Sequence, residues 1–378
     1  MIQYGQTEPA RGWTFTPSLG VSSVWDDNVL MQGADSHGPA DFVSVLAPHA
    51  ALGFTSARSS FSASYDGAFE LYRQFDSLNN YGQFESLTAR HRVTPRTNFY
   101  VQQELAVTPT TELPLVVGVP YIRMGATLAD GKAGLQHAFT KRTSVDLSYD
   151  FQVIAFDKDP VLGVVLFGGH GHTGIATLRH QMTAKTSLIA DYEVQHATIT
   201  NGAGTFTVQT ARAGAERKMT SSFVVFGEAG LALVSQSSFE NGQTAPSWRA
   251  GAAREFERFS VEGAYNRSFV PAFGVGDTIE SQDVGAHVKA TLTHRISADG
   301  GFDWLHERPL SQVAIATLGE APLRSLLVTG LVGYTASPWL RIEGFLSFTR
   351  QQIDRPGGQL DRNRFGIQVT TTKPMRVR

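Results

Sequence analysis

Few residues in this chain have the types and spacing that catalysis or metal binding requires. His170-Gly171-His172 is the tightest histidine pair. In a strand, residues i and i+2 share a face, so both imidazoles could reach one ion. The spacing fixes no third ligand, so we predict no metal site. Asp26-Asp27-Asn28 lies where the first predicted strand ends and could bind a cation, but a capped turn is the favoured interpretation.

Enzyme signatures are missing from the sequence. There is no Cys, which excludes disulfides, thiolate metal sites and cysteine nucleophiles. Neither a Gly-x-Ser-x-Gly motif, a phosphate loop nor a dinucleotide fingerprint occurs. The formal net charge is −2, without the basic footprint of a nucleic-acid-binding protein. We therefore predict no catalytic residue, no cofactor and no nucleic-acid partner, and we expect that the chain is not an enzyme.

Charged residues instead follow strands that alternate polar and apolar side chains. Strands that leave a turn carry acids on the polar face: Asp66, Glu70, Glu104, Asp146, Asp150, Asp191, Glu193, Glu228, Glu262 and Glu343. Strands that approach a turn carry bases there: Arg90, Arg92, Lys132, Arg179, Lys289 and Arg295. Acids and bases of neighbouring strands would then lie side by side and pair. A polar pore that orients hydrated solutes is a compatible interpretation, and these residues are our candidates for lining it.

The strands are separated by a recurring turn signature. Its best copies are Arg90–Thr97, Gln136–Thr143 and Arg179–Thr186, and weaker copies centre near residues 57, 221, 258, 298 and 337. The copies lie roughly forty residues apart, which leaves room for two strands and one long connection. Short turns on one side and long loops on the other are typical of transmembrane β-barrels. The turns also carry bases (Arg58, Arg96, Arg142, Lys185, Lys218 and Arg258), which either attract anionic solutes to this rim or only solvate it.

The turn count predicts the strand count. Eight turns join sixteen strands, one strand precedes the first long loop (Trp13–Trp25) and one follows the last (Leu360–Thr372), so we predict about eighteen strands, with sixteen possible. The strand from Thr143 places Val145, Leu147 and Tyr149 on one face and serines and acids on the other. Such alternation indicates a half-buried strand. A soluble β-sandwich would show it too, but we find no linker or composition shift.

We therefore predict an all-β fold: a single transmembrane antiparallel up-and-down β-barrel over residues 13–372, with short periplasmic turns and long extracellular loops. Residues 1–12 would form an N-terminal periplasmic segment and residues 373–378 a C-terminal tail. The start of the chain lacks a basic and apolar signal sequence, so we expect that a signal peptide was removed. Aromatic residues suggest two interfacial bands, one beyond the turns (such as Phe61 and Trp339) and one at the far strand ends: Phe69, Tyr72, Phe156, Trp248 and Phe269.

Two long connections are candidates for narrowing a pore. The segment Thr108–Gly125 has an apolar middle that is unfavourable in open water, and Glu112, Tyr121 and Arg123 are its constriction candidates. It either folds inward or packs on neighbouring loops. Pro160–Gly169 is a second candidate plug or a strand extension.

Short motifs give a family resemblance. Leu19–Val29, with its Trp25-Asp26-Asp27-Asn28 core, and the segments Arg90–Tyr100 and Gln136–Tyr149 resemble a family of outer-membrane β-barrel porins often associated with exopolysaccharide or capsule production. The resemblance implies a role in passing polymer and brings no catalytic residues. The chain departs from common barrel proteins by ending Lys373–Arg378 instead of on an aromatic residue.

The sequence thus favours a porin-like channel in the outer membrane of a Gram-negative bacterium, passing hydrophilic solutes or an exported polysaccharide. A loop-plugged scaffold barrel that partners periplasmic export proteins or a surface assembly is the alternative. A membrane-embedded enzyme is a third hypothesis. Outer-membrane lipid is the expected surrounding partner.

Overall fold

The computed structural model describes residues 11–33, 38–111, 121–157, 166–200, 204–236, 242–274, 277–310, 322–353 and 358–377. Its strands are β1 (Gly12–Asp26), β2 (Asp41–Thr55), β3 (Ser59–Tyr72), β4 (Asn80–Thr94), β5 (Thr97–Thr108), β6 (Ala126–Ala138), β7 (Thr143–Phe156), β8 (Gly169–Gln181), β9 (Thr186–Ile199), β10 (Gly204–Lys218), β11 (Phe223–Gln236), β12 (Gln243–Glu255), β13 (Phe259–Ala272), β14 (Asp277–Thr291), β15 (Ile296–Pro309), β16 (Leu323–Ser337), β17 (Leu340–Ile353), β18 (Gln359–Thr372) and β19 (Met375–Val377). A 3-10 turn, η2 (Asp76–Leu78), precedes β4. No helix in these ranges is long and apolar enough to span a membrane.

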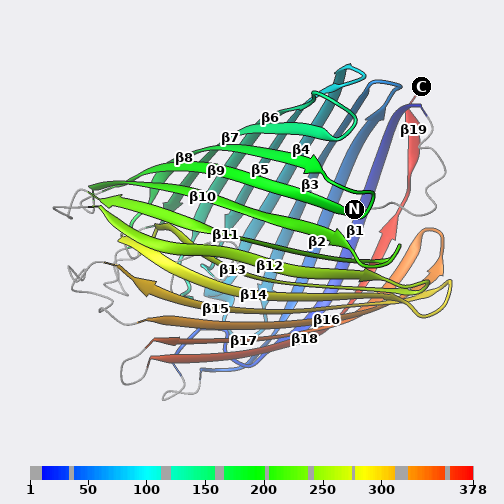
Figure 1. Ribbon diagram of the computed structural model, residues 1–378. Helices are drawn as coiled ribbons and strands as arrows, with labels where there is room; N and C mark the ends of the chain where they lie inside the picture. The colour runs from blue at the N-terminus through cyan, green and yellow to red at the C-terminus, as the bar shows by residue number, and fades with distance from the viewer. Residues whose placement is uncertain are drawn as a thin grey trace.

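Strands β1 to β18 form one closed antiparallel ring. Each strand pairs with its neighbours in the sequence, and β18 pairs with β1 over nine residue pairs from Ser18↔Thr372 to Asp26↔Arg364. Both termini lie at the end of the barrel that carries the short turns, and the long connections lie at the other end (Figure 1). Closure leaves no free strand edge in this ring. The predicted eighteen-strand up-and-down barrel is confirmed.

The segment expected as a C-terminal tail contains a short strand. β19 pairs antiparallel with the start of β1, from Trp13↔Val377 to Phe15↔Met375. The chain therefore continues past β18 along β1, which would otherwise pair only with β2 at this end. The last described residues thus extend the wall of the barrel.

The recurring turn signature has a local chemical cause. The hydroxyl of Thr140 accepts hydrogen bonds from the backbone N–H groups of Arg142 and Thr143, at 3.1 and 3.0 Å. Thr183 does the same with the two residues that end its turn, as do Ser56 and Thr293. A Ser or Thr that bonds to the backbone two and three residues later stabilises a tight turn. One predicted centre is wrong: the turn assigned near 298 spans 292–295, and Ile296 already begins β15.

Histidines at matching positions before three turns complete the signature. His91, His137 and His180 each place Nδ1 2.8–3.0 Å from the hydroxyl of a Ser or Thr that begins the preceding strand. The register places each of these pairs directly opposite one another. Because the same pair recurs at successive hairpins, these histidines join neighbouring hairpins at the turn end.

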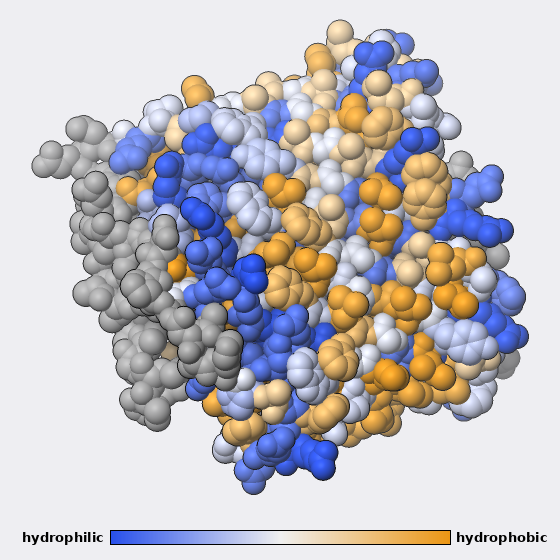
Figure 2. All heavy atoms as spheres, turned by 90° about the horizontal axis from the view of Figure 1, so that it is seen from below, coloured by the Kyte–Doolittle hydropathy of each residue, from blue (hydrophilic) through white to orange (hydrophobic). Residues whose placement is uncertain are grey.

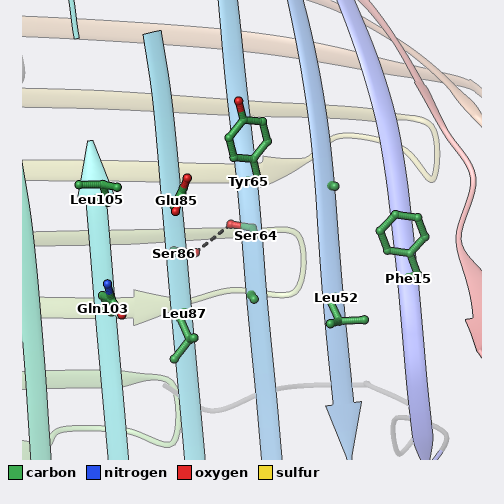
Figure 3. A pocket seen from close by; sticks show the side chains of 11 residues that line it. Phe15, Leu52, Ser64, Tyr65, Glu85, Ser86, Leu87, Gln103 and Leu105 are labelled. Carbon is green, nitrogen blue, oxygen red and sulfur yellow. Dashed lines mark hydrogen bonds between the residues drawn. The ribbon is translucent and has the colours of Figure 1, made fainter. Parts of the chain in front are cut away.

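The two faces of the wall differ in polarity. Large apolar side chains point outward along each strand, for example Leu147, Phe365 and Ile367, which are 46%, 54% and 63% exposed. Figure 2 shows apolar side chains gathered over much of one face of the molecule, with polar side chains on either side of them. Figure 3 shows the wall of β1 to β5, where Phe15, Leu52 and Leu105 line a shallow groove of about 400 Å³. An apolar outer band around a closed sheet is the surface that a lipid bilayer requires.

Inward-folded segments fill part of the loop end. Buried apolar residues from β5 to β13 gather there with Phe273, which follows β13. Phe167 exchanges backbone hydrogen bonds of 3.1 and 2.7 Å with Gly274, which links the connection before β8 to the one after β13. Leu166 packs with Met124 from the connection between β5 and β6.

The far aromatic band is only partly as predicted. Phe69 is 42% exposed, as an outer girdle residue should be. Tyr72 is buried in a cluster with Val24, Val29 and Val43, Phe156 packs against the apolar clusters of the loop end, and Phe269 is 4% exposed within one of them. The prediction is wrong for these three because folded-in connections offer aromatic rings apolar surface inside the barrel.

Candidate functional site

Most of the predicted charged residues lie on the inner face of the barrel. By strand register, every predicted pore-lining residue except Arg295 lies on the face opposite the exposed apolar side chains. Arg295 lies in the turn between β14 and β15, where its backbone N–H donates to the hydroxyl of Thr293. The parity of each strand decides the face, because successive side chains of a strand point to opposite sides.

Several inner-face acids and bases form ion pairs. Lys132 Nζ of β6 lies 3.2 Å from Asp150 Oδ2 of β7, and within β17 Arg341 Nε lies 2.7 Å from Glu343 Oε1. Arg179 pairs at 2.9 Å with Glu216, two strands away. These pairs neutralise part of the wall, and a dipolar lining remains along it.

A buried ion-pair network on the inner face involves an arginine absent from the sequence prediction. Arg212 on β10 donates to both oxygens of Asp191 on β9, at 3.3 and 2.9 Å, and to Glu193 at 3.0 Å. The Arg212 and Asp191 side chains are only 7% and 2% exposed. Arg249 adds bridges to Asp191 and to Glu228, at 3.6 and 2.8 Å. This group, Asp191, Glu193, Arg212, Glu228 and Arg249, is called the Arg212 network below.

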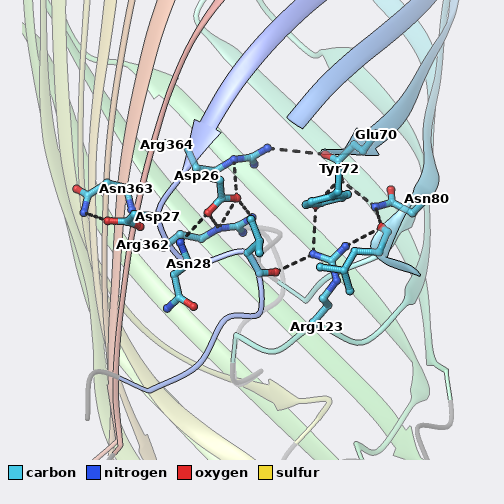
Figure 4. A network of polar contacts seen from close by, with 12 residues as sticks. Asp26, Asp27, Asn28, Glu70, Tyr72, Asn80, Arg123, Arg362, Asn363 and Arg364 are labelled. Carbon is cyan, nitrogen blue, oxygen red and sulfur yellow. Dashed lines mark hydrogen bonds and ion pairs between the residues drawn. The ribbon is translucent and has the colours of Figure 1, made fainter. Parts of the chain in front are cut away.

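A second network closes the ring at the loop end. Asp26, the last residue of β1, accepts hydrogen bonds from Arg362 Nε and Nη2 at 3.1 and 2.5 Å (Figure 4). Arg364 lies 3.6 Å from Asp26 and 3.7 Å from Glu70 on β3. The backbone N–H of Asn28 also donates to Asp26 Oδ1, which is the capped turn considered for this motif. The acidic motif therefore joins the first and last strands of the barrel.

The connection between β5 and β6 folds into the lumen. The Arg123 guanidinium donates to the carbonyls of Val29 and Leu78 at 3.0 and 2.9 Å and to the Tyr72 hydroxyl at 3.2 Å. The same guanidinium lies 4.8 Å from the Tyr72 ring centroid. Figure 4 shows Arg123 between Tyr72 and the backbone of neighbouring segments inside the barrel.

The same connection is anchored on a distant part of the wall. The Tyr121 backbone N–H donates to Gln351 Oε1 on β17 at 2.7 Å. In the ring, β17 and β6 are separated by six strands through β18 and β1, so this contact crosses the lumen. Of the two alternatives for the loop, inward folding is what the structure has. Glu112 lies outside the described residues.

A cavity in the lumen lies between two parts of the wall. It has a volume of about 440 Å³, and Asp66, Glu70, Arg362 and Arg364 contribute to its lining. Residues of β3 to β5 form one side and residues of β16 to β18 the other. A solute in this space would meet carboxylates and guanidinium groups together. Such groups bind and orient polar solutes.

The tight histidine pair lies away from the lumen. His170 and His172 share the outer face of β8, with ring centroids 5.6 Å apart, and His172 Nδ1 lies 2.6 Å from the Tyr149 hydroxyl. Within the described ranges, no group of three or more His, Asp or Glu side chains is arranged to hold a metal ion.

Comparisons with known proteins give similar folds only. No family model matches the chain, and no curated protein matches it either. Similar solved structures include OccAB4 from Acinetobacter baumannii, with 8% identity, a TM-score of 0.49, and coverage of 96% of this chain and 98% of that one. Another is OpdK from Pseudomonas aeruginosa, solved with vanillate, with 8% identity, a TM-score of 0.47, and coverage of 96% and 99%.

A third similar structure is the siderophore receptor PirA from Pseudomonas aeruginosa, with 10% identity, a TM-score of 0.47, and coverage of 97% of this chain and 81% of that one. At such identities and TM-scores, these similarities carry no argument about what this barrel passes. The properties of its own lumen must supply that argument.

Sequence reasoning overlooked four functional candidates, Arg212, Arg249, Arg362 and Arg364. Each lies on the inner face of its strand. The alternation that selected the other charges would also have selected these four. Their importance was hidden because the partners, such as Asp26 for Arg362, are up to 336 residues away in the chain.

Proposed function

We propose that this chain is a porin-like channel of the bacterial outer membrane that passes hydrophilic solutes. One observation carries the proposal: a closed eighteen-strand ring has an apolar outer band and a charged inner face. In a soluble barrel, exposing such a band to water would cost roughly 25 cal/mol for each Å² of apolar surface. A charged inner face is the natural lining for an aqueous path.

The contact between Tyr121 and Gln351 supports a gated or narrowed path. Segments that cross the lumen reduce the size of solutes that can pass, and the flanking charges select among them. Small hydrated solutes therefore fit the proposal better than a polysaccharide chain. Polymer export, which the family resemblance implies, is the less favoured form of the same proposal.

Single-channel recording tests this function. The full chain, folded in detergent and added to a planar bilayer, should give discrete conductance steps in potassium chloride. The same protein unfolded by heat should give none, which controls for detergent leakage. Folded, inserted protein without conductance at any voltage would contradict the channel.

The apolar cluster at the loop end favours a second candidate. Ala197, Phe206, Val208 and Val234 point inward, yet they are at most 2% exposed, because other segments cover them. A barrel filled in this way could act as a scaffold for export proteins or a surface assembly. Absence of conductance, together with stable insertion into lipid, would favour this role.

A further inference from the structure

The charges of the inner face do not balance. Most cations of the inner face are held in ion pairs: Lys132, Arg179, Arg212, Arg249, Arg341, Arg362 and Arg364. The inner-face bases of the described strands that lack such a pair lie toward the short-turn end. They are Arg90, Arg92, Lys218 and Lys289. Arg90 stands opposite Ser60 near the start of β3, and Lys289 stands in register between Ser260 of β13 and Asp299 of β15.

Carboxylates, in contrast, are left over farther from the turns. On one wall, Glu104 of β5 stands directly opposite Asp130 of β6. Neither carboxylate has a cationic side chain within ion-pair distance among the described residues, because the adjacent Lys132 is bound to Asp150. Like charges directly opposite each other across two strands are destabilising.

A similar arrangement lies almost on the opposite wall. Asp283 of β14 pairs in register with Leu305, and Asp303 of β15 is two residues from Leu305, so the two acids are diagonal neighbours on the inner face. Asp283 accepts a hydrogen bond from the neutral Asn266 at 3.0 Å. The nearest ionisable partner of Asp303 is His287, at 3.7 Å. β6 and β14 are eight strands apart in an eighteen-strand ring, so the two acid pairs flank the lumen from both sides.

Elsewhere on the inner face, buried carboxylates are paired with arginines. Asp191 and Glu228 both have arginine partners within the Arg212 network. Unneutralised carboxylates on two facing walls create a negative potential along the path between them. Low-dielectric walls focus such a field on ions inside the channel.

We infer that the channel prefers cationic solutes, such as hydrated metal ions and small organic amines, over anions of the same size. The inference rests on the proposed channel function. It assigns the preference to Glu104 and Asp130 on one wall and to Asp283 and Asp303 on the other. The basic residues of the short turns lie outside this region.

Reversal potentials measure the preference directly. In a tenfold gradient of potassium chloride, the wild-type chain should show a potassium-to-chloride permeability ratio above one. The double variants Glu104→Gln with Asp130→Asn, and Asp283→Asn with Asp303→Asn, should each lower this ratio at least twofold. These changes remove charge and keep shape, so the barrel should fold as before, which circular dichroism can verify.

A matched control removes one carboxylate from the outer wall. Glu85 lies on β4 beside the outward-facing Tyr65 and Leu105, and it lines the outer groove in Figure 3. Glu85→Gln should leave the permeability ratio unchanged. Conductance with a ratio at or below one, or double variants with an unchanged ratio, would overturn the cation preference alone. Absence of any conductance would instead overturn the proposed channel and this inference with it.

Discussion

At the residue scale, burial decides what each ion pair contributes. The Arg212 side chain is 7% exposed and meets two carboxylates and the Ser247 hydroxyl, whereas the Arg350 and Asp361 side chains, which pair with each other, are 47% and 31% exposed. Removing one member of a buried pair leaves an uncompensated charge, which costs about 3–5 kcal/mol. An exposed pair contributes about 0–1 kcal/mol, because water and salt screen it.

Arg212→Ala should therefore lower the free energy of unfolding by about 3–5 kcal/mol, since it removes the closest cationic partner of the buried Asp191 carboxylate. Urea titration of the protein folded into lipid vesicles measures this change. Arg350→Ala is the matched control and should cost no more than about 1 kcal/mol, since both members of its pair are exposed. Equal losses in the two variants would show that the Arg212 network is as solvated as the outer surface.

At the element scale, each strand works as a divider between two environments. Along β7, Leu147 faces outward between Leu135 and Ala176, and the adjacent Ser148 faces the lumen between Asp146 and Asp150. A shift of one residue in register would exchange these faces along the whole strand. The hydroxyl-stabilised turns, such as Thr140–Thr143, hold the register from one hairpin to the next.

Neighbouring positions on β7 should therefore lose different amounts of stability on the same substitution. Leu147→Arg places a charge in the apolar band and should destabilise the lipid-inserted barrel by about 2–4 kcal/mol. Ser148→Arg places it between two acids in the lumen and should cost much less. Unfolding titrations in vesicles compare the two, and a greater loss for Ser148→Arg would contradict the assignment of the faces.

At the scale of the whole molecule, contacts that cross the ring shape the lumen. Arg123 and Tyr121 connect one loop to Tyr72 on β3 and to Gln351 on β17. Phe167 and Gly274 connect two other loops. The wall itself is continuous, because β1 and β18 are hydrogen-bonded and joined by Asp26 and Arg362. The loops can therefore move without opening the barrel.

Arg123→Gln should increase the single-channel conductance. The guanidinium donates to two carbonyls and one hydroxyl, and losing these charge-assisted bonds weakens the attachment of the loop by about 2 kcal/mol. Such a change raises the displaced fraction of the loop by more than tenfold if the bonds alone hold it. Arg142→Gln, in a short turn, is the control for loss of charge, and an unchanged conductance in both variants would argue against a constriction at Arg123.

The amino-acid sequence alone determined the wall of this protein. Alternation in steps of two assigned Leu147 and Asp146 to opposite faces, and short polar clusters, most of them with a Ser or Thr, marked where hairpins end. Both signals act over a few residues, so they are readable in the chain. They predicted the strand number, the closed fold and the inner face for residues such as Glu104 and Asp191.

Only the tertiary structure decided what occupies the lumen. Asp26 and Arg362 are distant in sequence and meet because the ring closes. Arg212 is buried because neighbouring strands place Asp191 and Ser247 against it. The inward path of the loop around Arg123, and the burial of Tyr72 and Phe156 that the sequence assigned to a girdle, depend on surfaces contributed by distant strands. Contacts of this kind leave no periodic pattern in the sequence, so a short stretch of sequence does not predict them.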